Sequence, residues 1–80
     1  MHLSIHSLKN TLFDQVATQL TVPTTTGEIT ILDNHRALIT LLKKGVATII
    51  DDEDKEKKLT ITGGFLEVKP NNEVTVLIEE

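Results

Sequence analysis

The three histidines of this 80-residue chain are the side chains best suited to acid–base or metal chemistry at neutral pH. His2 and His6 lie four residues apart in a segment that alternates apolar and polar residues, so in a strand both face the same way. The rise of an extended strand places them roughly 13 Å apart, which is too far for one shared metal ion. We therefore expect two solvent-facing histidines and no metal site.

His35 lies beside Arg36 in a predicted loop that begins with Asp33-Asn34. Catalysis would require a nucleophile and a base within reach of each other, and neither serine of the chain, Ser4 or Ser7, is marked as activated. We favour a histidine that holds a turn by side-chain hydrogen bonds or contacts a partner. The sequence thus predicts no catalytic residue, no metal ligand and no bound cofactor.

Two further patterns suggest a ligand but lack the residues that the ligand requires. The acidic run 51–54 has no glycine at the sixth position of a calcium-binding loop, and Lys57 and Lys58 follow it closely. Gly63-Gly64 lacks the helix and the Lys-Ser/Thr pair of a phosphate-binding loop. We expect a solvated hairpin tip over 51–58. At the two glycines we expect a bulge or bend with positive φ or a close backbone approach.

Composition narrows the class of partner. The net charge of −4 disfavours a nucleic acid, and the absence of Trp and Tyr leaves few aromatic platforms on which bases could stack. With no cysteine, disulfides and thiolate metal sites are impossible. No apolar run approaches the ~20 residues that span a bilayer, and the N-terminus lacks the features of a signal peptide. We expect membrane association only through a protein partner.

Alternation with period two predicts an all-β fold, a flattened two-sheet β-sandwich of short strands, over a single domain of residues 1–80. In the second strand Val16, Thr18, Leu20 and Val22 are expected to share one face. Pro23 is expected to end this strand, because proline cannot donate to a sheet ladder. Residues 37–44 fit either a helix or a buried strand, and we favour a strand with a helical turn at its start. Turns are expected at 24–27 and 70–72. The expected strands are 2–6, 16–22, 28–32, 46–50, 59–62, 65–69 and 74–78.

Several motifs in a fixed order resemble the N-terminal domain of the ε subunit of F-type ATP synthase. That family commonly reads Val-Pro-Gly-x-x-Gly-Glu-x-Gly-Ile-Leu-Pro-x-His-Ala-Pro-Leu, and further on Lys-Pro-Gly-Val, Gly-Gly-Phe-x-Glu-Val and Val-Thr-Val-Leu. The chain is similar at Lys44-Gly45-Val46, at 63–68 and at 74–77. In the first motif it keeps Val22, Pro23, Gly27, Glu28, Ile31, Leu32, His35 and Leu38 in register. The resemblance covers essentially the whole chain.

The resemblance implies a rotor subunit without an active site, at the foot of the central stalk. It would bind the γ subunit on one side and the polar loops of the c-ring on the other, and so help to couple ion-driven rotation to ATP synthesis. It would lie at the cytoplasmic face of a bacterial inner membrane, with no small-molecule substrate. By match to the motif, Glu28 is expected near the ring and His35 near γ. The residues assigned to partner binding are Glu28, Thr30, Asp33, His35 and Arg36.

The chain departs from the family pattern in the loop expected to touch partners. Thr30 replaces a glycine, Asp33 replaces a proline, and Arg36-Ala37 replaces Ala-Pro. The segment 32–37 also matches the Leu-Asp-x-x-Arg-Ala pattern of ATP-binding ε subunits. We interpret this match as coincidence, because in that family the pattern lies in the C-terminal helical domain.

The helical hairpin that follows the family's β-domain is expected to be absent, so its inhibition of ATP hydrolysis is not carried over. The alternative hypothesis is a free-standing β-sandwich that binds another protein or inhibits it, without enzymatic activity.

Overall fold

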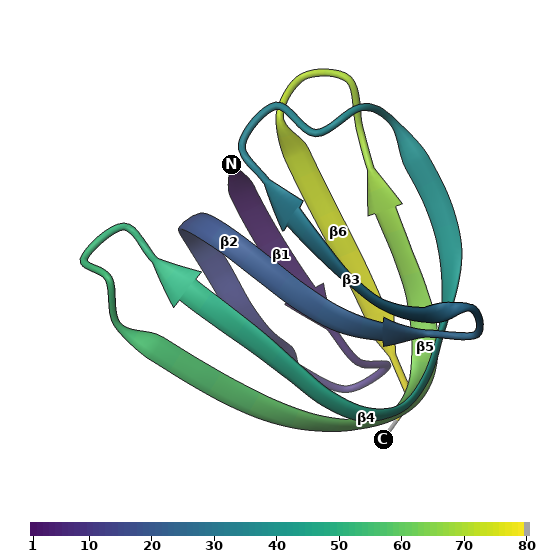
Figure 1. Ribbon diagram of the computed structural model, residues 1–80. Helices are drawn as coiled ribbons and strands as arrows, with labels where there is room; N and C mark the ends of the chain where they lie inside the picture. The colour runs from purple at the N-terminus through teal and green to yellow at the C-terminus, as the bar shows by residue number, and fades with distance from the viewer. Residues whose placement is uncertain (80) are drawn as a thin grey trace.

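The computed structural model describes residues 1–79, and all regular secondary structure in them is β-strand (Figure 1). The predicted all-β fold is confirmed, and β-branched residues are abundant along the strands, where they pack well on a pleated surface. The six strands are β1 (His2–His6), β2 (Thr11–Thr24), β3 (Gly27–Leu32), β4 (Leu38–Asp51), β5 (Glu56–Val68) and β6 (Glu73–Ile78).

The strands hydrogen-bond in the order β1-β6-β5-β4-β2-β3, and β1 also pairs with β2. All pairs are antiparallel except β1 with β6, which run parallel. The extra β1–β2 pairing bends the sheet back on itself, so that two curved layers enclose the core (Figure 1). One layer holds β3 with the later part of β2, and the other holds β1 and β6.

Strands β2, β4 and β5 are each 13 or 14 residues long and contribute to both layers. The side that faces the core changes along each of them. In β5, Ile61 and Gly63 are buried, and the buried positions then shift to Leu66 and Val68. Because side chains alternate with period two, such a shift turns the other face of the strand inward as it passes from one layer to the next.

Two glycines allow this passage between layers. Gly64 has φ 147°, and a Cβ placed there would lie 2.0 Å from the carbonyl oxygen of Leu77 on β6. Gly45 on β4 leaves room for the ring of Pro23, whose Cγ would lie 2.9 Å from an added Cβ. No side chain fits at Gly64 without moving backbone atoms, so this position fixes how closely β5 and β6 approach.

The core is aliphatic apart from Phe13. Its members come from all six strands and from Met1, and each is at most 8% exposed. The buried apolar residues are Met1, Leu3, Ile5, Phe13, Ala17, Leu20, Val22, Ile31, Leu42, Ala47, Ile49, Ile61, Leu66, Val68, Val74, Val76 and Ile78.

Three details of the sequence interpretation are wrong. Strand β2 continues through Pro23 to Thr24, because Pro23 pairs with Glu28 on β3 where the pairing of β2 with β4 is interrupted. No helical turn precedes β4, since the residues before Leu38 are a turn and extended chain. Val16 is 49% exposed, because β2 has one more residue than β4 between the pairs Ala17–Asp51 and Gln19–Ile50. This bulge reverses the side of β2 that faces the core.

Segment lengths also differ from those expected. The segments 59–62 and 65–69 belong to one strand, β5, whose pairing with β4 keeps a constant register across Gly63 and Gly64. The two glycines therefore form a bend and not a bulge. The hairpin tip between β4 and β5 is correspondingly shorter than predicted, at residues 52–55. The expected turns at 24–27 and 70–72 are confirmed, with Thr25-Thr26 as the turn residues of the first.

Replacing Gly64 with alanine should destabilise the protein by about 3 kcal/mol or more, because the new Cβ overlaps the Leu77 carbonyl. Gly63→Ala is the matched control, since its Cβ would meet its nearest atoms at 3.6 Å, an ordinary contact. Both glycines have φ values that strain an alanine, so we expect Gly63→Ala to lose about 1–3 kcal/mol from the backbone alone and Gly64→Ala clearly more. Urea unfolding followed by circular dichroism measures both, and equal losses would contradict the proposed role of Gly64.

Candidate functional site

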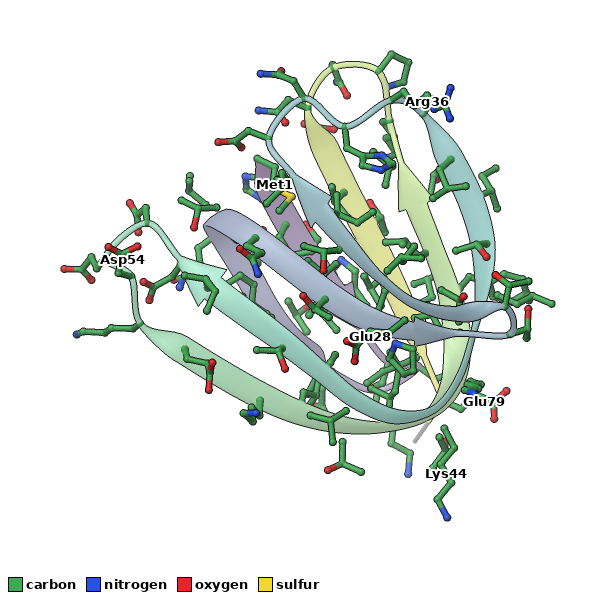
Figure 2. The ribbon with its side chains drawn as sticks, in the orientation of Figure 1. Met1, Glu28, Arg36, Lys44, Asp54 and Glu79 are labelled. Atoms are coloured by element: carbon green, nitrogen blue, oxygen red, sulfur yellow. The ribbon has the colours of Figure 1, made fainter. Side chains whose placement is uncertain are left out.

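The five residues assigned to partner binding lie at two ends of β3 and do not form one site. Glu28 and Thr30 are exposed on β3, whereas Asp33, His35 and Arg36 belong to the loop between β3 and β4. Figure 2 shows Arg36 at the upper edge of the molecule and Glu28 well away from it, near the middle of the view. Five residues of strand separate Glu28 from Asp33, which corresponds to roughly 17 Å. Any partner that contacts both ends must therefore extend along the sandwich, or there are two partners.

The loop from 33 to 37 begins with a tight turn. The backbone N–H of His35 donates to the carbonyl of Leu32 at 3.2 Å, and Asn34 has φ 60°, a left-handed conformation that asparagine tolerates. The ring of His35 contacts the carbonyl of Arg36 at 2.8 Å through Nδ1. Because a carbonyl only accepts, Nδ1 carries the hydrogen, and in the neutral ring Nε2 is left as an acceptor. The His35 ring thus makes a side-chain hydrogen bond within the loop, beside the exposed Arg36, while a backbone bond closes the turn itself.

Asp33 ties this loop to other parts of the fold. Its carboxylate is paired with the amino group of Met1, which also donates to the carbonyl of Ala17 at 3.0 Å. The hydrogen bond and the charge of that amino group hold the pKa of Asp33 below its ordinary value, and the Asn72 side chain lowers the pKa further. The Asn72 oxygen Oδ1 also accepts the backbone N–H of Asn34 at 2.7 Å. The β3–β4 loop is therefore held against the turn between β5 and β6.

The opposite end of β3 is fixed by one buried hydroxyl. Thr24 is 1% exposed, and its Oγ1 donates to the carbonyl of Gly27 and accepts the N–H of Thr26. These bonds close the two-residue turn that leads into β3 and so set the position of the exposed Glu28. On the next outward position of β3, the hydroxyls of Thr30 and Thr21 contact each other at 3.0 Å. The Thr30 side chain therefore already has a partner within the sheet.

An apolar row crosses the outer face of the layer formed by β4, β5, β6 and β1. Leu41, Phe65 and Leu77 are direct cross-strand partners, and each is about half exposed, at 51%, 54% and 52%. Ile39, two residues before Leu41 and 71% exposed, extends the row toward the β3–β4 loop. Single exposed apolar residues are ordinary, but directly paired ones form a contiguous patch of the kind that marks an interaction surface.

Sequence reasoning missed this apolar row, although the chain carries a sign of it. Where the row crosses each strand, apolar residues are adjacent instead of alternating, as in Leu41-Leu42, Phe65-Leu66 and the run 76–78. Adjacent apolar residues in a strand indicate that both faces are covered. In this structure the protein itself covers only the inward-facing residues of these runs. They are Leu42, Leu66, Val76 and Ile78.

His2 is exposed and His6 is half-buried, and each contacts β2. His2 Nε2 lies 2.6 Å from Oδ1 of Asp14, and His6 Nδ1 lies 3.2 Å from the hydroxyl of Thr11. The hydrogen bond from His2 lowers the pKa of the Asp14 carboxyl, with further contributions from the charge of His2, the Ser4 hydroxyl and the charge of His6. Within residues 1–79, no three His, Asp or Glu side chains are placed together so as to hold a metal ion.

A groove of about 560 Å³ lies between the start of β2 and the β4–β5 hairpin. Leu12, Phe13 and Ile49 contribute its apolar lining, and the ammonium of Lys57 lies 5.8 Å from the centre of the Phe13 ring. The remaining lining is polar and of mixed charge, and none of the five residues assigned to partner binding belongs to it.

Among residues 1–79 no helix is long and apolar enough to cross a membrane.

Comparison with known proteins gives a consistent match over the whole chain. Residues 1–80 match the family model described as ATP synthase, Delta/Epsilon chain, beta-sandwich domain. The ATP synthase epsilon chain of Pelotomaculum thermopropionicum is 41% identical over 75 residues, which cover 94% of this chain and 54% of that protein. The mitochondrial ATP synthase subunit delta of Yarrowia lipolytica is 39% identical over 75 residues, which cover 94% of this chain and 43% of that protein.

Solved structures share the fold at lower identity. A chain of the Euglena gracilis mitochondrial ATP synthase, in a structure of OSCP, F1 and c-ring, superposes with a TM-score of 0.92 at 22% identity. That match covers 98% of this chain and 49% of the other. A chain from the central stalk and c-ring structure of the Tetrahymena thermophila enzyme gives 0.85 at 15% identity, covering 100% and 63%. The chain thus spans about half the length of the curated relatives it matches.

The Asp14 contact predicts an acid-dependent contribution to stability. Because the pKa of Asp14 is lowered in the folded state, its ionised form stabilises the fold above about pH 4 and loses this effect as the pH falls through the lowered pKa. Asp14→Asn should therefore reduce the melting temperature at pH 5, and the difference from the parent should shrink as the pH is lowered toward 2. Asp52→Asn removes the same charge from the exposed hairpin tip and serves as the control. A difference that persists unchanged at pH 2 would contradict this account.

Proposed function

Because the chain belongs to the delta/epsilon β-sandwich family of ATP synthase, we propose that it is a central-stalk subunit that docks to γ and to the c-ring. In this role it transmits rotation from the ring to the catalytic head and carries out no reaction itself. The support is the family match, the likeness to chains of ATP synthase assemblies, and the presence of a contiguous apolar surface outside the core.

The apolar row Leu41–Phe65–Leu77 is the observation that carries the γ contact. Fully burying one such side chain contributes about 1.5–3 kcal/mol, so the half still exposed offers roughly 1 kcal/mol for each residue. Ile39 joins this row to the loop that contains His35, the residue expected near γ. We therefore propose that the row and the loop together face γ. An aromatic residue at the centre of a patch, flanked by aliphatic ones, is a typical anchor of a protein interface.

The end that carries Glu28 suits a different contact. It is a tight turn of threonines and glycine with an exposed carboxylate, and the buried Thr24 hydroxyl holds it in place. A rigid polar turn is adapted to polar loops, and a carboxylate would pair with basic or amide side chains on them. We propose that this end touches the polar loops of the c-ring.

The proposed location follows from the ring contact. The chain would be a peripheral component at the cytoplasmic face of a bacterial inner membrane, held there only by the complex. A bacterial epsilon chain and a mitochondrial subunit delta are about equally similar to this chain, at 41% and 39% identity. Cell fractionation of the source organism would show whether the protein is found with a bacterial inner membrane or with mitochondria.

Calorimetric titration with the cognate γ–c-ring complex tests the proposal. We expect saturable one-to-one binding. Failure to bind folded partners would overturn the stalk role and favour a free-standing binding module.

Replacing Phe65 with alanine should weaken binding to γ roughly ten-fold or more, with little change in melting temperature, because the side chain is half exposed in the free protein. Val46→Ala is the matched control, since Val46 is 44% exposed and lies outside the apolar row. Calorimetry with the isolated γ subunit measures both variants. If Val46→Ala lost as much affinity as Phe65→Ala, the apolar row would not be the γ surface.

Glu28→Ala and His35→Ala should weaken different contacts, because Glu28 lies near the start of β3 and His35 lies in the loop after its end. We expect Glu28→Ala to weaken binding to the ring alone and His35→Ala to weaken binding to γ alone. With the joined γ–c-ring complex, the two losses of binding free energy should add to within about 0.5 kcal/mol. Equal binding by the double variant would remove the assignment of both residues.

A further inference from the structure

We propose that Asn72 is a positioning residue that joins the β3–β4 loop and the β5–β6 turn into one preformed docking ridge. This inference rests on the proposed function, since the ridge consists of Asp33, His35 and Arg36 together with the exposed Asn71. Asn72 itself is half-buried and bonds to the loop, so its proposed effect on a partner is exerted through the loop that it holds.

Asn72 bonds to two segments that are far from it in the sequence. Its side-chain Oδ1 accepts the N–H of Asn34 at 2.7 Å, across 38 residues of sequence. Its backbone carbonyl accepts the N–H of His2 on β1 at 3.1 Å. Its side chain also acts on the carboxyl of Asp33, whose pKa it helps to lower. Asn72 therefore connects the β3–β4 loop to strand β1, which pairs with β6 beside the apolar row.

Both asparagines that meet have a left-handed backbone, which among the other non-glycine residues of 1–79 is found only at Asp54. Asn34 has φ 60° and Asn72 has φ 62°, both in the left-handed region. Such conformations are unfavourable for most residues, and they persist where the surroundings fix them. The hydrogen bond between Asn34 and Asn72 satisfies the amide at the bend of the loop and holds both bends in one arrangement.

The consequence for docking is preorganisation. Between Asn34 and the start of β4 the chain is irregular, and His35 and Arg36 take their direction from the turn that precedes them. A loop already ordered in its bound form binds with less loss of conformational entropy. If only a fraction of molecules held the loop correctly, the apparent affinity would fall by that fraction. Asn72 would thus raise affinity for γ without touching it.

Asn72→Gly isolates the side chain from the backbone, because glycine adopts φ 62° readily and lacks only the amide. Asn71→Gly is the matched control, since it adds the same unfolded-state freedom at the neighbouring exposed position. We expect the two variants to have similar melting temperatures. In Asn72→Gly, hydrogen exchange of the Asn34 amide should be about ten-fold faster and binding to the γ–c-ring complex about three- to ten-fold weaker. Asn71→Gly should change neither.

A double-mutant cycle with His35→Ala separates positioning from general destabilisation. If Asn72 acts through the loop, Asn72→Gly should cause little further loss of binding once His35 is absent. An undiminished loss in that background, or binding by Asn72→Gly equal to that of Asn71→Gly, would overturn the inference. If the parent protein itself fails to bind, the stalk proposal fails and the docking role of Asn72 fails with it. The exchange rate of the Asn34 amide then still shows whether the clamp exists.

Discussion

The close approach of β5 to β6 at Gly64 is the constraint on which the sandwich depends. A Cβ there would lie 2.0 Å from the Leu77 carbonyl, so only glycine lets β5 keep its pairing with β6 while it turns. On one side of the bend Ile61 faces the core, and on the other side Leu66 does. The bend thus lets one strand serve two layers. A pair of short strands would leave additional ends whose backbone groups need partners.

The same bend explains why an apolar row lies outside the protein. Once β5 has changed the side that faces the core, Leu66 points inward and its neighbour Phe65 must point outward. Phe65 is directly paired with Leu41 and Leu77, so the register that closes the core also aligns the exposed row. Strands β4, β5 and β6 therefore carry core residues on their inner face and the proposed γ surface on their outer face. A change at the bend would alter both.

Local patterns in the sequence identify the strands but not where each strand changes layer. Alternation places β1, β3 and β6 correctly, because each of these short strands stays in one layer. It fails in β2, where an extra residue between Ala17 and Gln19 reverses the side that faces the core and leaves Val16 exposed. The sequence analysis ends β2 too early, at Pro23. Proline lacks a backbone N–H, but this loss breaks a strand only where the sheet needs a hydrogen bond from that position, and β2 does not pair with β4 at Pro23. The contact between Asn34 and Asn72 depends on how distant loops meet, and composition and periodicity carry no information about it.

The two outer faces of the sandwich differ in a way that bears on its proposed role. Across one layer the direct partners are Thr30, Thr21 and Thr48, with the hydroxyls of the first two in contact. Across the other they are Leu41, Phe65 and Leu77. Threonine hydroxyls are satisfied by one another and by water, whereas half-exposed leucine and phenylalanine gain free energy when a partner covers them. The apolar face gains free energy only when another protein covers it, whereas the polar face and the turn that carries Glu28 can meet a polar partner without an apolar contact. That asymmetry suits the proposed role, in which one face packs against γ and the Glu28 turn meets the polar loops of the ring.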